Sequence, residues 1–216
     1  MSFYQELLQH TEADRAGLLS APIIGRALRG EITVADYAAF LGQAYHHVKH
    51  TVPLVMAVGG RLPERLEWLR AAVAEYIEEE IGHHEWVLDD IAACGFDREE
   101  VRASRPLPAT ELMVAYAYDT VQRGNPVGFF GMVLVLEGTS IRLADRVADA
   151  VQQATGLPDN AFTYLRSHGA LDQDHVRFYA DLMDRLEQAD DRAAVSHAAG
   201  MFYRLYGDLF RSLDPA

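Results

Sequence analysis

The chain has 216 residues, of which 50% are hydrophobic and 24% are charged, so it can bury a core and is not a disordered chain. Its 19 Lys and Arg against 32 Asp and Glu give a formal net charge of −13, which argues against nucleic acid and anionic membranes as partners. The single cysteine, Cys94, excludes an intramolecular disulfide and a cysteine-rich metal site. Without a signal-peptide pattern or an uninterrupted apolar stretch of roughly 18 residues, we expect one cytoplasmic domain spanning residues 1–216.

Apolar residues recur every three or four positions along nearly the whole chain, which is the helical period. No segment alternates in the way that predicts a strand, so we predict an all-α fold with a single helical bundle. Pro53 should kink the third helix rather than end it, because the apolar period continues beyond it. The segment 97–107 is predicted to be an irregular connection. The predicted helices cover residues 3–18, 22–29, 33–59, 63–94, 108–123, 126–155, 160–188 and 190–213.

Histidines gather in three groups on three of these helices. One group is His168, Asp172 and His175, at positions i, i+4 and i+7. On one continuous helix, at about 100° per residue, these three side chains share one narrow face. Two imidazoles and a carboxylate suit iron, manganese or zinc, and the mixture with open coordination positions is typical of non-heme iron. The alternative is an exposed polar face on which the match is accidental.

A second group lies within residues 78–86. Glu80 and His83 have the Glu-x-x-His spacing of carboxylate-bridged di-iron bundles. Glu80 and His84 are also about one turn apart, so either histidine could be the ligand, and we expect only one of them to face the interior. The zinc-protease pattern is absent because no histidine stands three residues after Glu85. The alternative is an acidic, solvated helix face that happens to carry histidines.

Glu137 stands at the end of the apolar run 129–136. A lone carboxylate in such a run is costly to bury unless it is paired with a cation or bound to a metal. A helix this apolar is buried nearly all round, so Glu137 should face something positive. We prefer a metal ion, and the alternative is a buried salt bridge to Arg142 or Arg146.

Three more histidines lie in the segment predicted to be the third helix. His47 and His50 are three residues apart and flank the same groove, whereas His46 is expected to be the most exposed. His47, His50 and His84 are therefore kept as side chains that either add a ligand or hydrogen-bond to one.

These residues together resemble the heme-oxygenase-like all-helical superfamily, and within it the non-heme di-iron oxidases and oxygenases. Thiaminase-type TenA proteins and pyrroloquinoline-quinone synthase belong to the same superfamily. The resemblance covers nearly the whole chain in helix number, helix order and ligand spacing. It implies a single-domain heme-oxygenase-like bundle whose metal ligands are Glu80, His83, Glu137, His168, Asp172 and His175.

The chain departs from this family in its second histidine group, and also in the preceding helix, where some members supply a carboxylate and this chain has His46, His47 and His50. Many members place a glutamate seven residues before the ligand histidine, where this chain has Tyr76, so Glu80 is expected to substitute for it. True heme oxygenase is similar in fold only. It needs an axial histidine in its first helix, where His10 is the one histidine available, and a bent glycine-rich helix that Gly131 and Gly138 do not match.

The resemblance implies an iron-dependent oxidoreductase that activates O2 at a non-heme site, with two iron ions expected and manganese as a substitute, to oxidise a small molecule. One alternative is a cofactor-free enzyme of the TenA or quinone-synthase kind that uses histidines as acid and base. Another is a non-catalytic bundle that binds a small ligand. The expected partners are substrate and O2, without nucleic acid or membrane. The apolar helix predicted at 190–213 suggests a homodimer surface or a cover for the core.

Overall fold

The computed structural model describes residues 1–170 and 172–214, and the side chains of residues 168–175 lie outside that description. Over the described ranges every regular element is a helix, which confirms the predicted all-α class. The α-helices are α1 (Phe3–His10), α2 (Glu12–Leu19), α3 (Pro22–Leu28), α4 (Val34–Val48), α5 (Thr51–Arg61), α6 (Glu67–Glu80), α7 (His83–Ala93), α8 (Arg98–Ala103), α9 (Pro108–Gln122), α10 (Phe129–Thr155), α11 (Thr163–Ala170), α12 (Asp172–Asp184) and α13 (Ala189–Arg211), with short 3-10 turns at Glu64–Leu66, Pro126–Gly128 and Asp159–Ala161.

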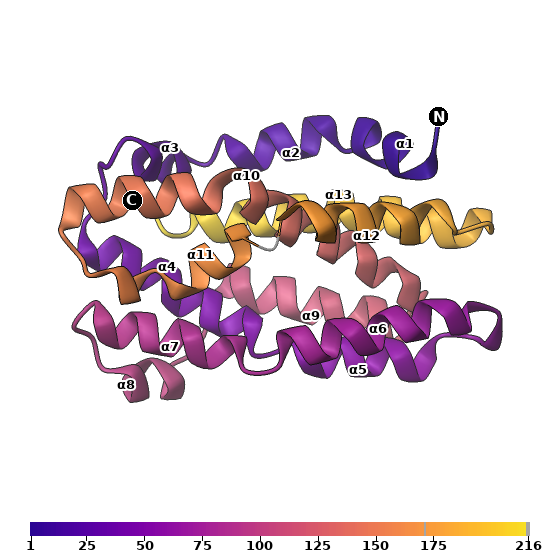
Figure 1. Cartoon of the computed structure of the whole chain (residues 1–216), viewed down its shortest axis with the longest axis horizontal. Coiled ribbons are helices and arrows are strands. Elements are labelled where there is room, and N and C mark those ends of the chain that lie inside the picture. Colours follow the sequence, from indigo (N-terminus) through magenta and orange to yellow (C-terminus); the bar gives the residue numbers. More distant parts are fainter. Residues whose placement is uncertain (171, 215–216) are drawn as a thin grey trace.

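Helices α10 and α13 form the centre of the bundle and pack against each other. Figure 1 shows the N-terminal helices α1–α3 along one side of this pair, and α5, α6, α7 and α9 along the other. Helix α13 also packs against α2 and α9, and α10 against α3 and α11. The long α10 therefore contacts both sides of the molecule, and its buried face runs through the interior.

Two apolar cores meet on α10. Its first two turns, from Phe129 to Val135, belong to a large core shared with α1, α5, α6, α9, α12 and α13. Its later residues Ala144, Ala148 and Val151 belong to a smaller core shared with α4, α7 and α11. The turn between them carries Glu137 and Ser140, so the polar interruption of α10 falls where the two cores join.

Two predicted long helices are each divided, and the breaks have identifiable causes. The expected kink at Pro53 is wrong, because α4 ends at Val48 and α5 begins at Thr51. Pro53 lies in the first turn of α5, where its missing N–H has no helical acceptor to lose. The predicted helix 63–94 is divided at Gly82, whose φ of +94° favours glycine and ends the α-helical path.

One further segment differs from the prediction. The segment 97–107, expected to be irregular, contains α8, because the side chain of Asp97 accepts hydrogen bonds from the N–H groups of Glu99 and Glu100 and starts the helix. In the predicted helix 160–188, the described residues on both sides of position 171 are helical, as α11 and α12. Because residue 171 lies outside the description, one continuous helix with a shared face for His168, Asp172 and His175 stays a prediction.

The apolar composition of α10 is explained by its burial. Among the described residues, one helical segment, Pro126–Thr155, is long and apolar enough to cross a membrane by length and composition. Most of its apolar window is buried inside the bundle, as in the core helix of any all-α domain. Helix α13 likewise places Phe202, Tyr203 and Leu209 in the core, so much of its apolar surface is used within the chain, and the homodimer stays a prediction.

Gly131 lets α10 approach α13 closely. A Cβ atom added at Gly131 would lie 2.5 Å from the backbone nitrogen of Ala199 and 2.7 Å from the carbonyl oxygen of Val195. These are backbone atoms of a packed helix, so they cannot turn aside as a flexible side chain would. Gly138, two turns later on the same helix, meets nothing within 4 Å of its added Cβ.

We predict opposite effects for the same substitution at these two glycines. Gly131→Ala should destabilise the protein by about 1–3 kcal/mol, because α10 and α13 must separate. Gly138→Ala should stabilise it by about 0.5–1 kcal/mol, since alanine is the better residue inside a helix. Urea unfolding measures both, and equal unfolding midpoints for the two variants would contradict the close approach.

Candidate metal centre

A cavity of about 70 Å³ lies where the two cores join. Helices α4, α5, α6, α10, α11 and α13 all contribute to its wall. Most of the wall is apolar, with Phe129, Met132 and Leu136 from α10 among its side chains. Two carboxylates, Glu80 and Glu137, open into it, so an apolar chamber contains two acidic groups.

Glu137 is the less solvated of these carboxylates. Burial, together with the negative charges of Glu80 and Glu79, raises the pKa of Glu137 from 4.5 to about 8. Arg142 and Arg146 are both exposed, and in the described part of the chain no salt bridge joins either of them to Glu137. The buried salt bridge considered from the sequence is therefore not formed there, and the carboxyl of Glu137 faces other acids instead of a cation.

Glu80 and His83 come together at the bend between α6 and α7. Glu80 is the last residue of α6 and His83 the first of α7, with Gly82 forming the turn between them. Nδ1 of His83 lies 3.2 Å from Oε2 of Glu80, and the imidazole stacks on the ring of Trp86 at 4.1 Å between centroids. The sequence spacing had implied that the two residues share one helix face. In the structure they instead lie on either side of a bend between two helices.

The two adjacent histidines have different surroundings. The His83 side chain is 4% exposed and directed at Glu80, whereas the His84 side chain is 37% exposed and lies 3.4 Å from Glu85. Of the two candidates from the sequence, His83 is thus the one beside the cavity. His84 takes part in a surface network of charged groups.

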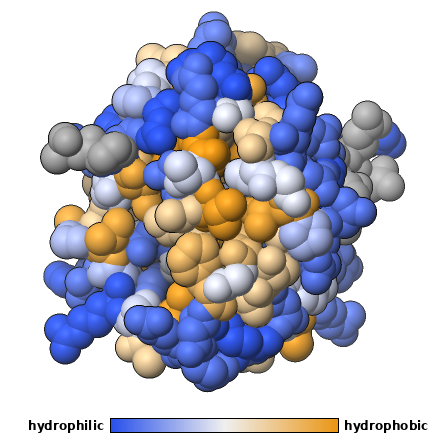
Figure 2. Space-filling view, turned by 90° about the vertical axis from the view of Figure 1, so that its left-hand side faces the viewer, coloured by the Kyte–Doolittle hydropathy of each residue, from blue (hydrophilic) through white to orange (hydrophobic). Residues whose placement is uncertain are grey.

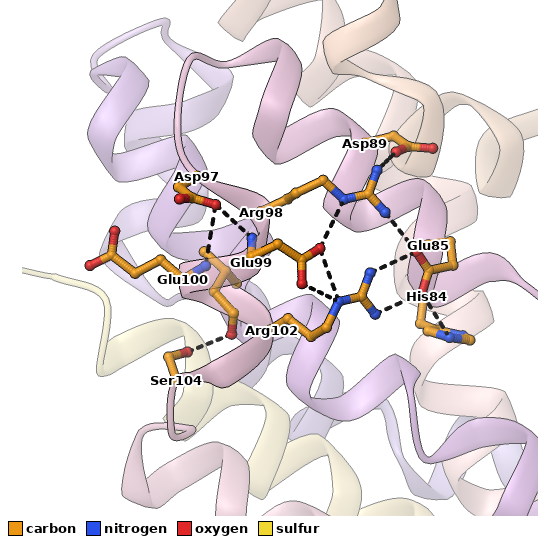
Figure 3. A network of polar contacts seen from close by, with 10 residues as sticks. His84, Glu85, Asp89, Asp97, Arg98, Glu99, Glu100, Arg102 and Ser104 are labelled. Atoms are coloured by element: carbon orange, nitrogen blue, oxygen red, sulfur yellow. Dashed lines mark hydrogen bonds and ion pairs between the residues drawn. The ribbon is translucent and has the colours of Figure 1, made fainter.

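That network fixes the first turn of α7, as Figure 3 shows. Glu85 accepts hydrogen bonds from Arg98 at 2.7 Å and from both terminal nitrogens of Arg102 at 2.8 and 3.0 Å. Arg98 also pairs with Asp89. The hydrogen bond from Arg102 holds the pKa of Glu85 below its usual value. Because Glu85 is two residues after His83, the network ties α8 to the turn that orients His83.

Tyr76 adds a polar group to the cavity. In the sequence it stood out only because many family members have a glutamate at this position. It lines the cavity from α6, and its hydroxyl is buried without a hydrogen-bond partner in the described structure. Burial raises the pKa of Tyr76 well above 10, and the charges of Glu137, Glu79 and Glu80 add to the rise. A buried hydroxyl without a partner is costly, so this atom is a donor available to a bound molecule.

The histidines of α4 and the following turn point in three directions. His47 is buried, lines the cavity and meets the ring of Tyr206 edge-on at 5.8 Å between centroids. His50 hydrogen-bonds Tyr118 at 3.1 Å and is not among the described residues of the cavity wall. His46, expected to be exposed, is instead buried, with Nε2 of its ring 2.9 Å from the hydroxyl of Ser104. Ser104, which follows α8, lies against His46, a contact that the helical period could not predict.

Asp90 of α7 positions the start of α11. Its buried carboxylate accepts hydrogen bonds from the backbone N–H groups of Thr163 at 3.0 Å and Tyr164 at 2.8 Å. It thereby caps α11 from another helix, although burial raises the pKa of Asp90 to about 6. This cap places Tyr164 in the cavity wall and sets the direction in which α11 continues toward His168.

Three of the six predicted ligands lie in one region of the described structure, Glu80 and Glu137 in the cavity wall and His83 next to Glu80. Glu80, His83 and Glu137 offer two carboxylates and one imidazole from three helices, a donor set that suits iron or manganese. Within the described side chains, no group of three or more His, Cys, Asp or Glu is compact enough to hold an ion. The other predicted ligands, His168, Asp172 and His175, have side chains outside the described residues, so all six ligand assignments stay predictions.

Comparison with known proteins agrees with the fold and with iron. The profile of a family described as iron-containing redox enzyme matches residues 38–207. No curated protein matches the sequence. A domain of unknown function with a heme oxygenase-like fold from Shewanella denitrificans has a similar structure, with 27% identity, a TM-score of 0.86, and coverage of 99% of this chain and 92% of that one.

Two more distant structures share the fold. A TenA homolog from Pseudomonas syringae is 14% identical with a TM-score of 0.80, covering 97% of this chain and 91% of its own. Heme oxygenase from Leptospira interrogans is 15% identical with a TM-score of 0.77, covering 98% and 100%. Because the family profile extends over most of the sequence, the chain belongs to the family of iron-containing redox enzymes, with a heme oxygenase-like fold.

Proposed function

We propose that this protein is an iron-dependent oxidoreductase that activates O2 at a non-heme site and oxidises a small molecule. The observation that carries the proposal is the position of Glu137, a buried carboxylate that faces Glu80 and Glu79 and has no cationic partner in the described structure. Buried charge of one sign is unfavourable unless a cation neutralises it. A divalent metal ion is such a cation, and the family is one of iron-containing enzymes.

In this proposal Glu80, His83 and Glu137 hold iron together with His168, Asp172 and His175. Two ions are expected in the loaded form, and manganese satisfies the same donors. Iron bound there would supply the electrons that reduce O2. His47 lines the same cavity and is available as a further donor or as a hydrogen-bond partner, whereas His50 and His84 are directed elsewhere.

The chain's own side chains prepare the chamber for this chemistry. Phe129, Met132 and Leu136 exclude water from the carboxylates, which strengthens electrostatic interactions inside. The hydroxyl of Tyr76 can donate a hydrogen bond to a polar atom of the occupant. Without a cation Glu137 holds a proton at neutral pH, because its pKa is about 8, and it must release that proton to act as a ligand.

The two neighbouring histidines provide a matched test of iron binding. His83→Ala should lower the iron bound per chain and weaken affinity by about 10–100-fold, because it removes an imidazole beside Glu80. His84→Ala should leave iron binding unchanged, since that side chain is on the surface with Glu85. Iron is measured by metal analysis after anaerobic loading. Equal loss of iron in both variants, or loss in neither, would remove His83 from the proposed site. A folded wild-type chain that takes up no iron would instead favour a cofactor-free enzyme.

Glu137 predicts a pH dependence for the stability of the metal-free chain. Its folded pKa of about 8 exceeds its ordinary 4.5, so the folded state holds the proton more tightly than the unfolded state. That stabilisation is complete below the ordinary pKa and is lost as the pH rises through 8. Relative to Glu137→Gln, which cannot titrate, the wild-type free energy of unfolding should fall by on the order of 3 kcal/mol between pH 5 and 8.

Urea unfolding of chelator-treated protein at a series of pH values makes this measurement. Asp145→Asn, on the exposed face of the same helix, is the control and should follow the wild type at every pH. Iron content should fall in Glu137→Gln and stay unchanged in Asp145→Asn. Parallel stability profiles for the wild type and Glu137→Gln would mean that the carboxyl of Glu137 is not buried in the way described.

A further inference from the structure

A second cavity of about 70 Å³ lies beside the candidate metal centre, and the proposed chemistry does not use it. It is lined by α3, α4, the later turns of α10, α11 and α13. Its wall is aliphatic and aromatic, and includes Ile24, Phe40, Leu143, Val147 and Phe210. An apolar lining of this kind is typical of small-molecule sites.

The two cavities share a wall. Among the described residues, Ser140, Tyr164 and Tyr206 line both of them, so these side chains separate the carboxylates from the apolar chamber. Helix α10 lines both cavities: Glu137 lies in the wall of the first, Ser140 in the walls of both, and Val147 in the wall of the second. Ten residues of helix separate Glu137 from Val147, which corresponds to about 15 Å along the axis.

Among the described lining residues, no Arg or Lys is positioned to receive an anion. Neither cavity has Arg or Lys among its described lining residues, and the segment 168–175 contains none in its sequence. The acidic rim residue of the second cavity, Asp36, is already paired with Arg26 at 3.2 Å, and Arg26 is also bound by Asp214 at 3.3 Å. An anionic occupant would therefore meet Glu80 and Glu137 without a compensating protein charge.

The chamber lies toward the end of the molecule that carries α3 and the last turns of α10. Figure 2 views that end and shows an apolar area at its centre, surrounded by hydrophilic residues. An apolar area with a polar rim is typical of the entrance to a ligand site.

We propose that the second cavity binds the apolar part of an uncharged or cationic amphiphile, whose polar end passes Ser140, Tyr164 and Tyr206 and reaches the carboxylate cavity. An alcohol, an amide or an amine with an aliphatic or aryl portion has this chemistry. Identifying this molecule as the substrate rests on the proposed function, whereas its binding does not, because the cavity is formed by the chain alone.

The experiment is calorimetric titration of the full-length, metal-free chain with 1-butanol, 1-hexanol, 1-octanol, n-octylamine and octanoate at pH 7. Each added methylene should tighten binding by about fourfold as it enters the apolar chamber. Octylamine should bind at least as tightly as 1-octanol, and octanoate at least tenfold more weakly. Octanoate binding as tightly as 1-octanol, or an affinity that does not change with chain length, would overturn the proposal.

Two tryptophan substitutions locate the binding. Val147→Trp fills the outer part of the second cavity and should weaken 1-octanol binding at least tenfold. Val101→Trp adds the same ring at a partly buried position that packs on the same core but is absent from the described wall of either cavity, so it should leave binding unchanged. Circular dichroism checks that both variants fold, and Leu143→Phe replaces Val147→Trp if the latter does not.

A folded cavity variant that binds 1-octanol as the wild type does would contradict the assignment. The outcome is independent of the iron measurements. Chain-length-dependent binding without iron uptake would retain the amphiphile site and remove the oxidase proposal, whereas iron uptake without alcohol binding would do the reverse.

Discussion

The structure depends on one electrostatic constraint, the burial of Glu137 beside other carboxylates inside an apolar bundle. α10 is the central helix, and Glu137 occupies the turn at which its two apolar cores join. Burial and the charges of Glu79 and Glu80 raise its pKa to about 8, so the fold keeps an acid where its charged form is unfavourable. Such an arrangement costs stability unless a cation or proton satisfies it, and strained electrostatics of this kind are concentrated at functional sites.

Three local features shape the cavity around Glu137. The glycine bend at Gly82 places His83 beside Glu80, and the charged network around Glu85 holds that bend. The missing side chain of Gly131 lets α10 approach α13. The cap from Asp90 starts α11 at the cavity wall. Each is a backbone feature or a polar interaction, which shows that contacts between apolar side chains alone do not build the site.

The all-α class and most helix positions could be predicted because a period of three to four apolar residues is a local signal. The same signal missed the division at Gly82, because a positive φ depends on the surrounding structure. It also predicted a kink at Pro53, whereas the chain breaks between Val48 and Thr51, because the start of a helix depends on its surroundings as well. Glu137 was recognised because an acid in an apolar run stands out. The burial of His46 and the wall formed with Tyr206 depend on contacts between distant segments, and no local pattern encodes them.

The most direct test of the central claim is anomalous diffraction at the iron absorption edge from crystals of the anaerobically iron-loaded chain. The account predicts an iron peak in the cavity between α6, α7 and α10, within coordination distance of Glu80, His83 and Glu137, with further ligands from residues 168–175. Iron bound at the protein surface, or a cavity without an anomalous peak in an iron-containing crystal, would contradict it.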